Sequence, residues 1–225
     1  MLTESTMTRA NASLRNHLPI FEVLGFAPTT LEERKQALAI LNEVSERGRT
    51  KRRQLMDVID YTSHEFLAQG SDMNQRYTSS AVFVEGAGER PPLPSDPALY
   101  HEPHTFPGLR LPHAWLNTAI PQQQLSTLDL AGKGRFTLFT GHGGDAWRTA
   151  AISVSRTLGI DIAVFAVGYG LQYEAVYNDW YRLREVGEDG CVLVRPDNFI
   201  AWRSKTLAED CSTALRVVFQ SILAL

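Results

Sequence analysis

The short motif most suggestive of chemistry is a glycine-rich string, Gly141-His142-Gly143-Gly144-Asp145-Ala146, which has the spacing G-x-G-x-x-A. It lies between a predicted strand, Phe136–Thr140, and a predicted helix, Asp145–Leu158. Glycines in such a place can let the pyrophosphate of a dinucleotide approach the backbone. The acid that would bind the ribose belongs at the end of the next strand, but Asp161 stands at its beginning. We therefore interpret the string as a tight strand-to-helix turn, with Asp145 capping the helix.

Three histidines, His101, His104 and His113, are the next candidates, and they fall in a stretch rich in proline. Proline keeps the backbone extended there, so side chains three residues apart do not converge on one ion as they would on a helix. We expect no metal site, and we expect these histidines to hydrogen-bond backbone groups. General acid–base use of one histidine stays open, because neutral imidazole near pH 7 suits that role.

The two cysteines, Cys191 and Cys211, show neither a C-x-x-C motif nor the spacing of a zinc module. A redox-active thiol needs the start of a helix, where the dipole stabilises the thiolate, and residues 141–147 contain no cysteine. The sequence therefore predicts two buried free thiols and argues against disulfide exchange and glutathione transfer.

Three amphipathic helices are predicted in the first part of the chain. The first covers residues 8–25, and the second begins at a capping box, Thr30 to Glu33, and runs to Gly48. The third ends at Gly70 and carries on one face Leu55, Ile59, Thr62 and Phe66.

Between and after these helices the pattern is less regular. A basic run over residues 47–53 is placed in the turn between the second and third helices, and residues 77–85 alternate enough for a strand. Residues 86–121 are crowded with prolines, among them Pro91, Pro92, Pro94, Pro97, Pro103, Pro107 and Pro112. Because proline fixes φ and lacks an amide proton, this stretch is predicted to be a long extended linker.

After the linker the predicted strands are residues 126–130, Phe136–Thr140, 162–167, Cys191–Val194 and 199–202. A helix at Asp145–Leu158, a helix at the end of the chain and a turn at Arg195-Pro196-Asp197-Asn198 complete the pattern. The order strand–helix–strand, intervening segment, hairpin, helix predicts an α/β fold, a thioredoxin-like sandwich without a C-x-x-C motif. The aromatic side chains of this half are interpreted as packing: Tyr173, Tyr177, Trp180, Tyr181 and Trp202.

The composition is that of an ordinary globular protein, with 44% hydrophobic and 21% charged residues among 225. A net charge of -3 argues against nucleic acid as a partner. No apolar run reaches about 18 residues, and the N-terminus lacks a signal-peptide core. We therefore expect no membrane association and a cytoplasmic location.

Six strings stand in a fixed order along the chain: Arg9-Ala-Asn-Ala-Ser-Leu-Arg-Asn16, Met73-Asn-Gln-Arg-Tyr77, Pro107-Gly-Leu-Arg-Leu-Pro-His-Ala-Trp115, Ser126-Thr-Leu-Asp-Leu130, Cys191-Val-Leu-Val-Arg-Pro-Asp197 and Ala201-Trp-Arg-Ser204. In this order the sequence resembles the C-terminal part of class A flavin-dependent aromatic hydroxylases, in particular the phenol and chlorophenol monooxygenases. The resemblance runs almost from end to end.

The resemblance implies that residues 1–85 form the last helices of a flavin domain, residues 86–121 a linker, and residues 122–225 the thioredoxin-like domain. The family binds FAD through an N-terminal G-x-G-x-x-G turn, an Asp-Gly motif and a Gly-Asp motif, and none has a counterpart in this sequence. We therefore expect no bound cofactor and no self-sufficient monooxygenase activity. No catalytic residue of the family can be transferred to this chain.

Three functions are compatible with these features. The main hypothesis is a cofactor-independent cyclase or isomerase, for example of the Diels–Alder type, acting on a small apolar natural-product intermediate. Its candidate substrate-binding residues lie in the segment that joins the two parts: Tyr77, His104, His113 and Trp115. The second is a non-catalytic subunit that dimerises or stabilises a larger assembly. As partners we expect a small apolar molecule or self-association, with the chain forming a homo-oligomer or binding another pathway enzyme. The third is the C-terminal half of a split FAD-dependent monooxygenase whose flavin half is another chain.

Overall fold

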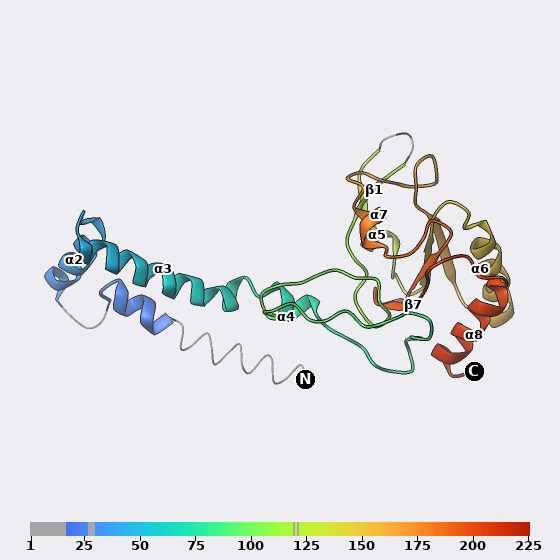
Figure 1. The fold of residues 1–225 in the computed structure, drawn as a ribbon, viewed down its shortest axis with the longest axis horizontal. Coiled ribbons are helices and arrows are strands. Elements are labelled where there is room, and N and C mark those ends of the chain that lie inside the picture. Colours follow the sequence, from blue (N-terminus) through green and yellow to red (C-terminus); the bar gives the residue numbers. More distant parts are fainter. Residues whose placement is uncertain (1–16, 27–29, 119, 121) are drawn as a thin grey trace. The chain divides into compact units, whose positions relative to one another are not determined.

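The computed structural model describes residues 17–26, 30–118, 120 and 122–225 (Figure 1). Its contacts divide the chain into two compact units. One unit ends at Met73 and also takes in Pro94–His101, and the other consists of Asn74–Leu93 and Glu102–Leu225. The domain boundaries expected after residues 85 and 121 stay a prediction.

The first unit is helical. It contains a helical segment at residues 17–23, then α2 (Leu31–Ala39), the 3-10 helix η1 (Ile40–Asn42), α3 (Glu46–Phe66) and α4 (Gln69–Met73). Residues 8–16 of the first predicted helix lie outside the described residues. The predicted capping box is confirmed, since Thr30 and Glu33 each accept a hydrogen bond from the other's amide. The third helix ends at Phe66, so the predicted end at Gly70 is wrong, and Gly70 lies in α4.

Helix α3 also corrects the predicted helix end at Gly48. The chain leaves the helical conformation at Glu43, which is extended, and the Ser45 hydroxyl accepts a hydrogen bond from the Gly48 amide at 3.1 Å. This bond satisfies one of the amides that a helix start leaves without a partner, so Gly48 lies in the first turn of α3. The basic residues 47–53 therefore lie on a helix and not in a turn.

The second unit is built on a four-stranded sheet of β3 (Phe136–Thr140), β4 (Ile162–Ala166), β6 (Cys191–Val194) and β7 (Ile200–Ser204). The strand order is β4-β3-β6-β7, with β3 parallel to β4 and antiparallel to β6. Helices α6 (Asp145–Leu158) and α8 (Cys211–Leu223) pack together over one face (Figure 1), around buried Leu138, Trp147, Leu193 and Phe219. This is the thioredoxin-like α/β sandwich that the sequence predicts.

The other face of this sheet carries a smaller layer. It contains the three-stranded sheet β2 (Leu125–Ser126), β1 (Trp115–Asn117) and β5 (Glu174–Ala175), with the short helices α5 (Thr127–Leu130) and α7 (Asp179–Leu183). Its core joins Leu116, Phe139, Trp180 and Ile200, all almost fully buried. Both faces of the main sheet are therefore covered, in keeping with the continuously apolar strands β4 and β6.

Two predicted strands of this unit are wrong. Residues 126–130 form the cap and helix of α5, because the Ser126 hydroxyl accepts from the Leu128 amide while the Asp129 carboxylate accepts from the Ser126 amide. Residues 77–85 form turns, and the Phe83 amide makes a single bond to the Ala201 carbonyl in place of a strand ladder.

The stretch predicted as a linker is mostly irregular, but it is not a solvated tether. It contains β1 and contributes side chains that are almost fully buried, Ala87, Phe106, Leu111 and Leu116. Its chain is fixed by backbone bonds such as those from Gly108 to Ile200 and from Leu111 to Asn198. Within the described part of the chain, no helix is both long and apolar enough to cross a bilayer.

Candidate functional site

The space beside the glycines of the glycine-rich string is occupied by other atoms of the protein. A Cβ at Gly144 would lie 1.9 Å from the Thr140 hydroxyl oxygen, and one at Gly141 would lie 2.7 Å from the Glu188 carbonyl oxygen. The interpretation as a tight strand-to-helix turn is therefore confirmed. Asp145 is not the cap, however, because Gly144 occupies that position and no side chain caps α6. The turn does not fit the pyrophosphate of FAD, because protein atoms already occupy the space next to Gly141 and Gly144 that a phosphate would need.

Both cysteines are buried free thiols, as predicted. Burial in the apolar core raises the pKa of the Cys191 thiol well above its usual value and also raises the pKa of Cys211. A protonated and inaccessible thiol is a poor nucleophile, so these residues belong to the packing of the sandwich. Across the described ranges of the chain, no group of three or more histidine, cysteine or acidic side chains could hold a metal ion.

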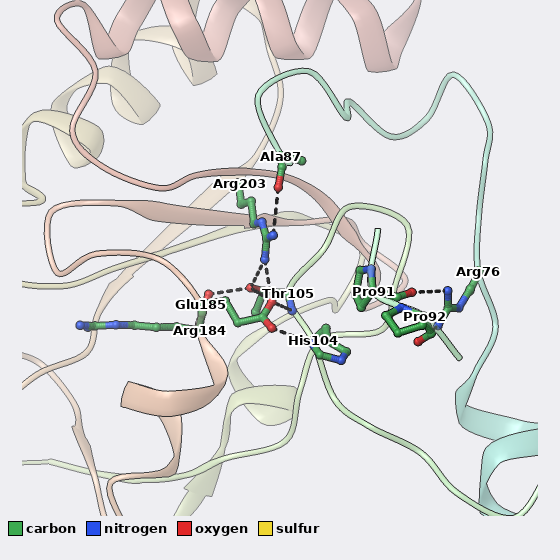
Figure 2. A network of polar contacts seen from close by, with 9 residues as sticks. All are labelled: Arg76, Ala87, Pro91, Pro92, His104, Thr105, Arg184, Glu185 and Arg203. Atoms are coloured by element: carbon green, nitrogen blue, oxygen red, sulfur yellow. Dashed lines mark hydrogen bonds and ion pairs between the residues drawn. The ribbon is translucent and has the colours of Figure 1, made fainter. Parts of the chain in front are cut away.

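His104 is part of a polar network (Figure 2). Its Nδ1 lies 2.6 Å from one carboxylate oxygen of Glu185, while the other oxygen accepts a bond of 2.6 Å from Arg203 on β7. Arg203 also donates to the carbonyl of Ala87 and to the Thr105 hydroxyl, which in turn donates to the backbone carbonyl of Arg184. The network ties two segments of the irregular stretch to the sandwich.

The pKa of Glu185 is shifted by its place in this network. Burial alone would raise the pKa of Glu185, but hydrogen bonds from His104, Arg203 and the Thr105 amide outweigh it and lower the pKa below its ordinary value. Arg203 is almost fully buried, and its guanidinium is compensated by this carboxylate. The geometry indicates an anchor that holds the irregular stretch against β7.

Arg76 makes a second anchor of the same kind. Its guanidinium donates to the carbonyls of Pro91 and Pro92 at 2.7 and 2.9 Å, and Figure 2 shows its side chain extending toward these two prolines. Proline cannot donate a hydrogen bond but its carbonyl accepts one, so the arginine holds the proline-rich backbone in place.

The other sequence candidates fall in two further places. Tyr77 packs edge-on against Phe199 with 4.5 Å between ring centroids, and the guanidinium of Arg195 lies 5.2 Å from its ring. His113 and Trp115 lie together, with centroids 4.8 Å apart, and His113 Nδ1 is 2.7 Å from the Ser126 hydroxyl. Among the described residues, no hydrogen bond or ring contact joins Tyr77, His104 and the His113–Trp115 pair, and their role as substrate-binding residues stays a prediction.

A hollow of about 570 Å³ lies where the parallel strands β3 and β4 end. Its walls come from the turns after these strands, from the loop after β5, and from α7 and the residues that follow it. Ligands of α/β proteins often bind outside the carboxyl ends of the strands, where such turns meet. We call this hollow the strand-end pocket.

Three tyrosines stand at the mouth of the strand-end pocket. Tyr169, Tyr177 and Tyr181 are 88%, 62% and 58% exposed, whereas Trp180 in its wall is buried. The prediction that the aromatic residues of this half serve packing is therefore right for Trp180 and wrong for Tyr177 and Tyr181. The sequence offers no local signal for the pocket, because its residues run from His142 to Glu188 and meet only through the fold.

One cation lies almost buried in this pocket. Arg184 is 7% exposed, its guanidinium lies 4.9 Å from the ring of Tyr181, and its nearest carboxylate oxygen belongs to Glu188 at 3.9 Å. In Figure 2 its side chain extends away from Glu185 and the polar network. Its guanidinium makes no hydrogen bond to any residue that the structure describes, and its Nε is buried without a partner.

The strand turns around the pocket are held by a histidine. His142 Nε2 lies 2.9 Å from the carbonyl oxygen of Tyr169. Because a carbonyl only accepts, Nε2 carries the proton and donates, which links the turn after β3 to the turn after β4. Gly168 lies against the same ring, where a Cβ would come within 2.7 Å.

Comparison with other proteins places the chain in a family. A family model described as "Aromatic-ring hydroxylase, C-terminal" matches residues 104–223. Phenol 2-monooxygenase of Pseudomonas sp. (strain EST1001) is 45% identical over 95% of this chain and 35% of its own length. The 2,4-dichlorophenol 6-monooxygenase of Delftia acidovorans is 38% identical over 99% of this chain and 38% of its own length.

The solved structures agree. The flavin-dependent monooxygenase PieE, in complex with FAD and substrate, gives a TM-score of 0.82 at 36% identity, over 99% of this chain and 38% of that one. The structure of aklavinone-11 hydroxylase in a complex with FAD and aklavinone gives a TM-score of 0.58 at 27% identity. This match covers 80% of this chain and 34% of that one. The chain thus spans little more than a third of each relative. It belongs to the aromatic-ring hydroxylase family, and it matches the C-terminal region of that family.

Proposed function

We propose that this chain serves as the C-terminal part of a flavin-dependent hydroxylase that acts on a phenolic ring. The observation that supports this most is the likeness to PieE over 99% of the chain at a TM-score of 0.82. Residues of both the helical unit and the thioredoxin-like unit therefore find counterparts in one flavin-dependent monooxygenase. The phenol and dichlorophenol monooxygenases among the relatives favour a phenol as the substrate class.

In this proposal FAD is held by a flavin-binding part outside these residues, in the same polypeptide or in another chain. The glycine turn at Gly144 is closed by Thr140 and does not form a nucleotide cradle, and the two buried cysteines do not form a redox-active thiol pair. FAD supplies the redox chemistry when it is bound. The contribution of this chain is a preformed scaffold whose irregular stretch is fixed by Arg203, Glu185 and Arg76.

The comparisons support this hydroxylase role better than the cofactor-independent cyclase. Every relative named above is a monooxygenase or hydroxylase. The contacts of Tyr77, His104 and His113 are to Phe199, Glu185 and Ser126, and they lend the cyclase hypothesis no support. The cyclase and the stabilising subunit both stay predictions.

The proposal is tested by reconstitution. The purified chain is mixed with the flavin-binding part of the Pseudomonas phenol 2-monooxygenase, and also joined to it, in the presence of phenol, O2 and NAD(P)H. One oxygen atom of O2 enters the ring and the other leaves as water, with NAD(P)H as the reductant. We expect hydroxylated phenol only when both parts are present. Conversion of a pathway intermediate by the chain alone, without flavin or NAD(P)H and faster than in buffer, would instead support the cyclase.

A further inference from the structure

The strand-end pocket carries a combination of groups that the proposed function leaves unused. We propose that it is a binding site for a neutral phenolic molecule, that is, an aromatic ring system bearing a protonated hydroxyl. The pocket lies wholly within the second unit, between the ends of β3 and β4, the loop after β5 and α7. Its volume of about 570 Å³ is in the range of small-molecule sites.

The polar end of the site is the pair Arg184 and Glu188. The 3.9 Å between the guanidinium nitrogen and the carboxylate oxygen is too long for a direct hydrogen bond, but one oxygen atom can reach both. A hydroxyl suits this gap, because it donates to a carboxylate and accepts from a guanidinium at the same time. The Arg184 side chain is only 9% exposed, and its guanidinium makes no hydrogen bond to the described residues. A hydroxyl that accepts from it would offset the desolvation of these donors.

The position of Arg184 is set by its surroundings. Its carbonyl accepts from the buried Thr105 hydroxyl at 2.6 Å, and a Cβ at Gly141 would lie 3.2 Å from its terminal nitrogen. The absence of a side chain at Gly141 therefore leaves room for the guanidinium at the end of β3. A fixed donor loses less conformational entropy on binding than a flexible surface arginine does.

The remaining walls suit an aromatic ring. Val167, Ala175 and Trp180 present apolar surface, and Tyr169, Tyr177 and Tyr181 stand exposed around the opening. Tyrosine rings offer a large, rigid contact area to another ring at a low cost in side-chain entropy. A solvent molecule could bridge the polar pair, but only a ring would also cover these side chains.

The charges of the pocket select a neutral ligand over an anion. Glu174 and Glu188 both line it, against the single permanent cation of Arg184. Glu174 accepts a bond of 2.7 Å from the Gly170 amide. A carboxylate ligand would meet two like charges, whereas a phenol uses one carboxylate as its acceptor.

Binding is measured by calorimetry on the purified chain alone, at pH 7 and without flavin. The probes are 2-naphthol, whose hydroxyl stays protonated at this pH like that of tyrosine, and two ring analogues, naphthalene and 2-naphthoate. We expect 2-naphthol to bind with a dissociation constant of about 1 mM or tighter. We expect it to bind about tenfold more tightly than either analogue.

The variants are R184M and E188A, with R182M as the matched control. Arg182 lies in α7, two residues before Arg184, is 74% exposed and does not line the pocket. We expect R184M and E188A each to weaken 2-naphthol binding about tenfold, and R182M to leave it unchanged. Glu188 is 56% exposed, so E188A keeps the test valid even if R184M fails to fold.

Three results would overturn the proposal: no saturable binding of 2-naphthol, binding that E188A leaves unchanged, or tighter binding of 2-naphthoate that E188A strengthens further. The last result would mark an anion site. Because the chain is titrated alone, none of these results bears on the proposed hydroxylase role.

Discussion

At the scale of single residues, the molecule depends on charges that are buried and compensated. Arg203 is 8% exposed, yet it reaches the Glu185 carboxylate and the carbonyl of Ala87. A nearby carboxylate offsets the desolvation penalty of a buried cation. When the carboxylate is removed, that penalty is no longer offset and the folded state is destabilised. The network should therefore be sensitive to loss of the carboxylate charge and insensitive to loss of nearby surface charges.

The substitution E185Q tests this directly. Arg203 would then face a neutral amide, and we expect the free energy of unfolding to fall by about 1–3 kcal/mol, since the carboxylate is partly exposed to water. The matched control is R182Q, which removes the exposed pair with Asp179 and should change stability by less than about 0.5 kcal/mol. Urea unfolding measures both, and equal effects of E185Q and R182Q would contradict the account.

The same carboxylate predicts a pH dependence. Its pKa is lowered in the folded protein, so the unfolded chain binds the proton more tightly. The stability that Glu185 contributes is therefore fully present above the ordinary pKa of a glutamate and is lost as the pH falls below it through the lowered value. We expect the stability difference between wild type and E185Q to shrink over this acidic window. Unfolding curves at several pH values check this, and a difference that grows on acidification would show that the sign is wrong.

At the scale of elements, the strongest sequence patterns predicted the fold well. The strands β4 and β6 are continuous apolar runs in the sequence, and the apolar residues of helix α6 recur at helical spacing, so these elements were predictable. The errors lie where short polar side chains decide the backbone. Ser126 and Asp129 form a capping box that outweighs the strand-like pattern of residues 126–130, and Ser45 starts a new helix before Gly48. Such capping signals are short, and they compete with the longer apolar pattern around them.

The strand-end pocket had no comparable signal. Its polar pair, Arg184 and Glu188, stands more than forty residues beyond His142, and the fold alone brings them to one place. The local sequence around an exposed tyrosine resembles that around a buried aromatic residue. The sequence therefore does not show that Tyr177 is exposed while Trp180 is buried. The anchor at Glu185 was equally hidden, since its partners His104 and Arg203 come from distant segments.

The two glycines that flank α6 allow a matched prediction for this element. G144A would place a Cβ 1.9 Å from the Thr140 hydroxyl oxygen. In G159A the new Cβ would meet no other atom, and only the backbone strain of an alanine at a φ of 65° would remain. We expect G159A to lower the free energy of unfolding by about 1 kcal/mol, and G144A to lower it further, by up to about 3 kcal/mol. Thermal and urea unfolding measure both. A G144A protein as stable as G159A would mean that the turn has room for a ligand after all.

At the scale of the whole molecule, the two units differ in how much they bury. Of the 21 residues of α3, only Gly48 and Thr62 are buried, whereas all of β6 is. An element with few buried contacts opens by local unfolding more often than one in a closed core. The apolar side chains that α3 leaves exposed, among them Met56, Ile59 and Phe66, are consistent with a surface that another part of a hydroxylase covers.

Hydrogen exchange tests this difference. In the chain alone, we expect the amides of α3 to exchange on the order of 100-fold faster than those of β6. When the flavin-binding part of the Pseudomonas relative is joined to the chain, protection of α3 should rise while that of β6 stays constant. Equal protection of the two elements in the chain alone, or no change in α3 on joining, would count against the proposed docking of this unit.

The central claim is most directly tested by a chimera. The segment of the Pseudomonas phenol 2-monooxygenase that aligns with this chain is replaced by it, and the rate of phenol hydroxylation is compared with that of the same enzyme lacking the segment. The account predicts that the chimera binds FAD and hydroxylates phenol, while the shortened enzyme does not. A chimera that folds and binds FAD, yet forms no more product than the shortened enzyme, would contradict it.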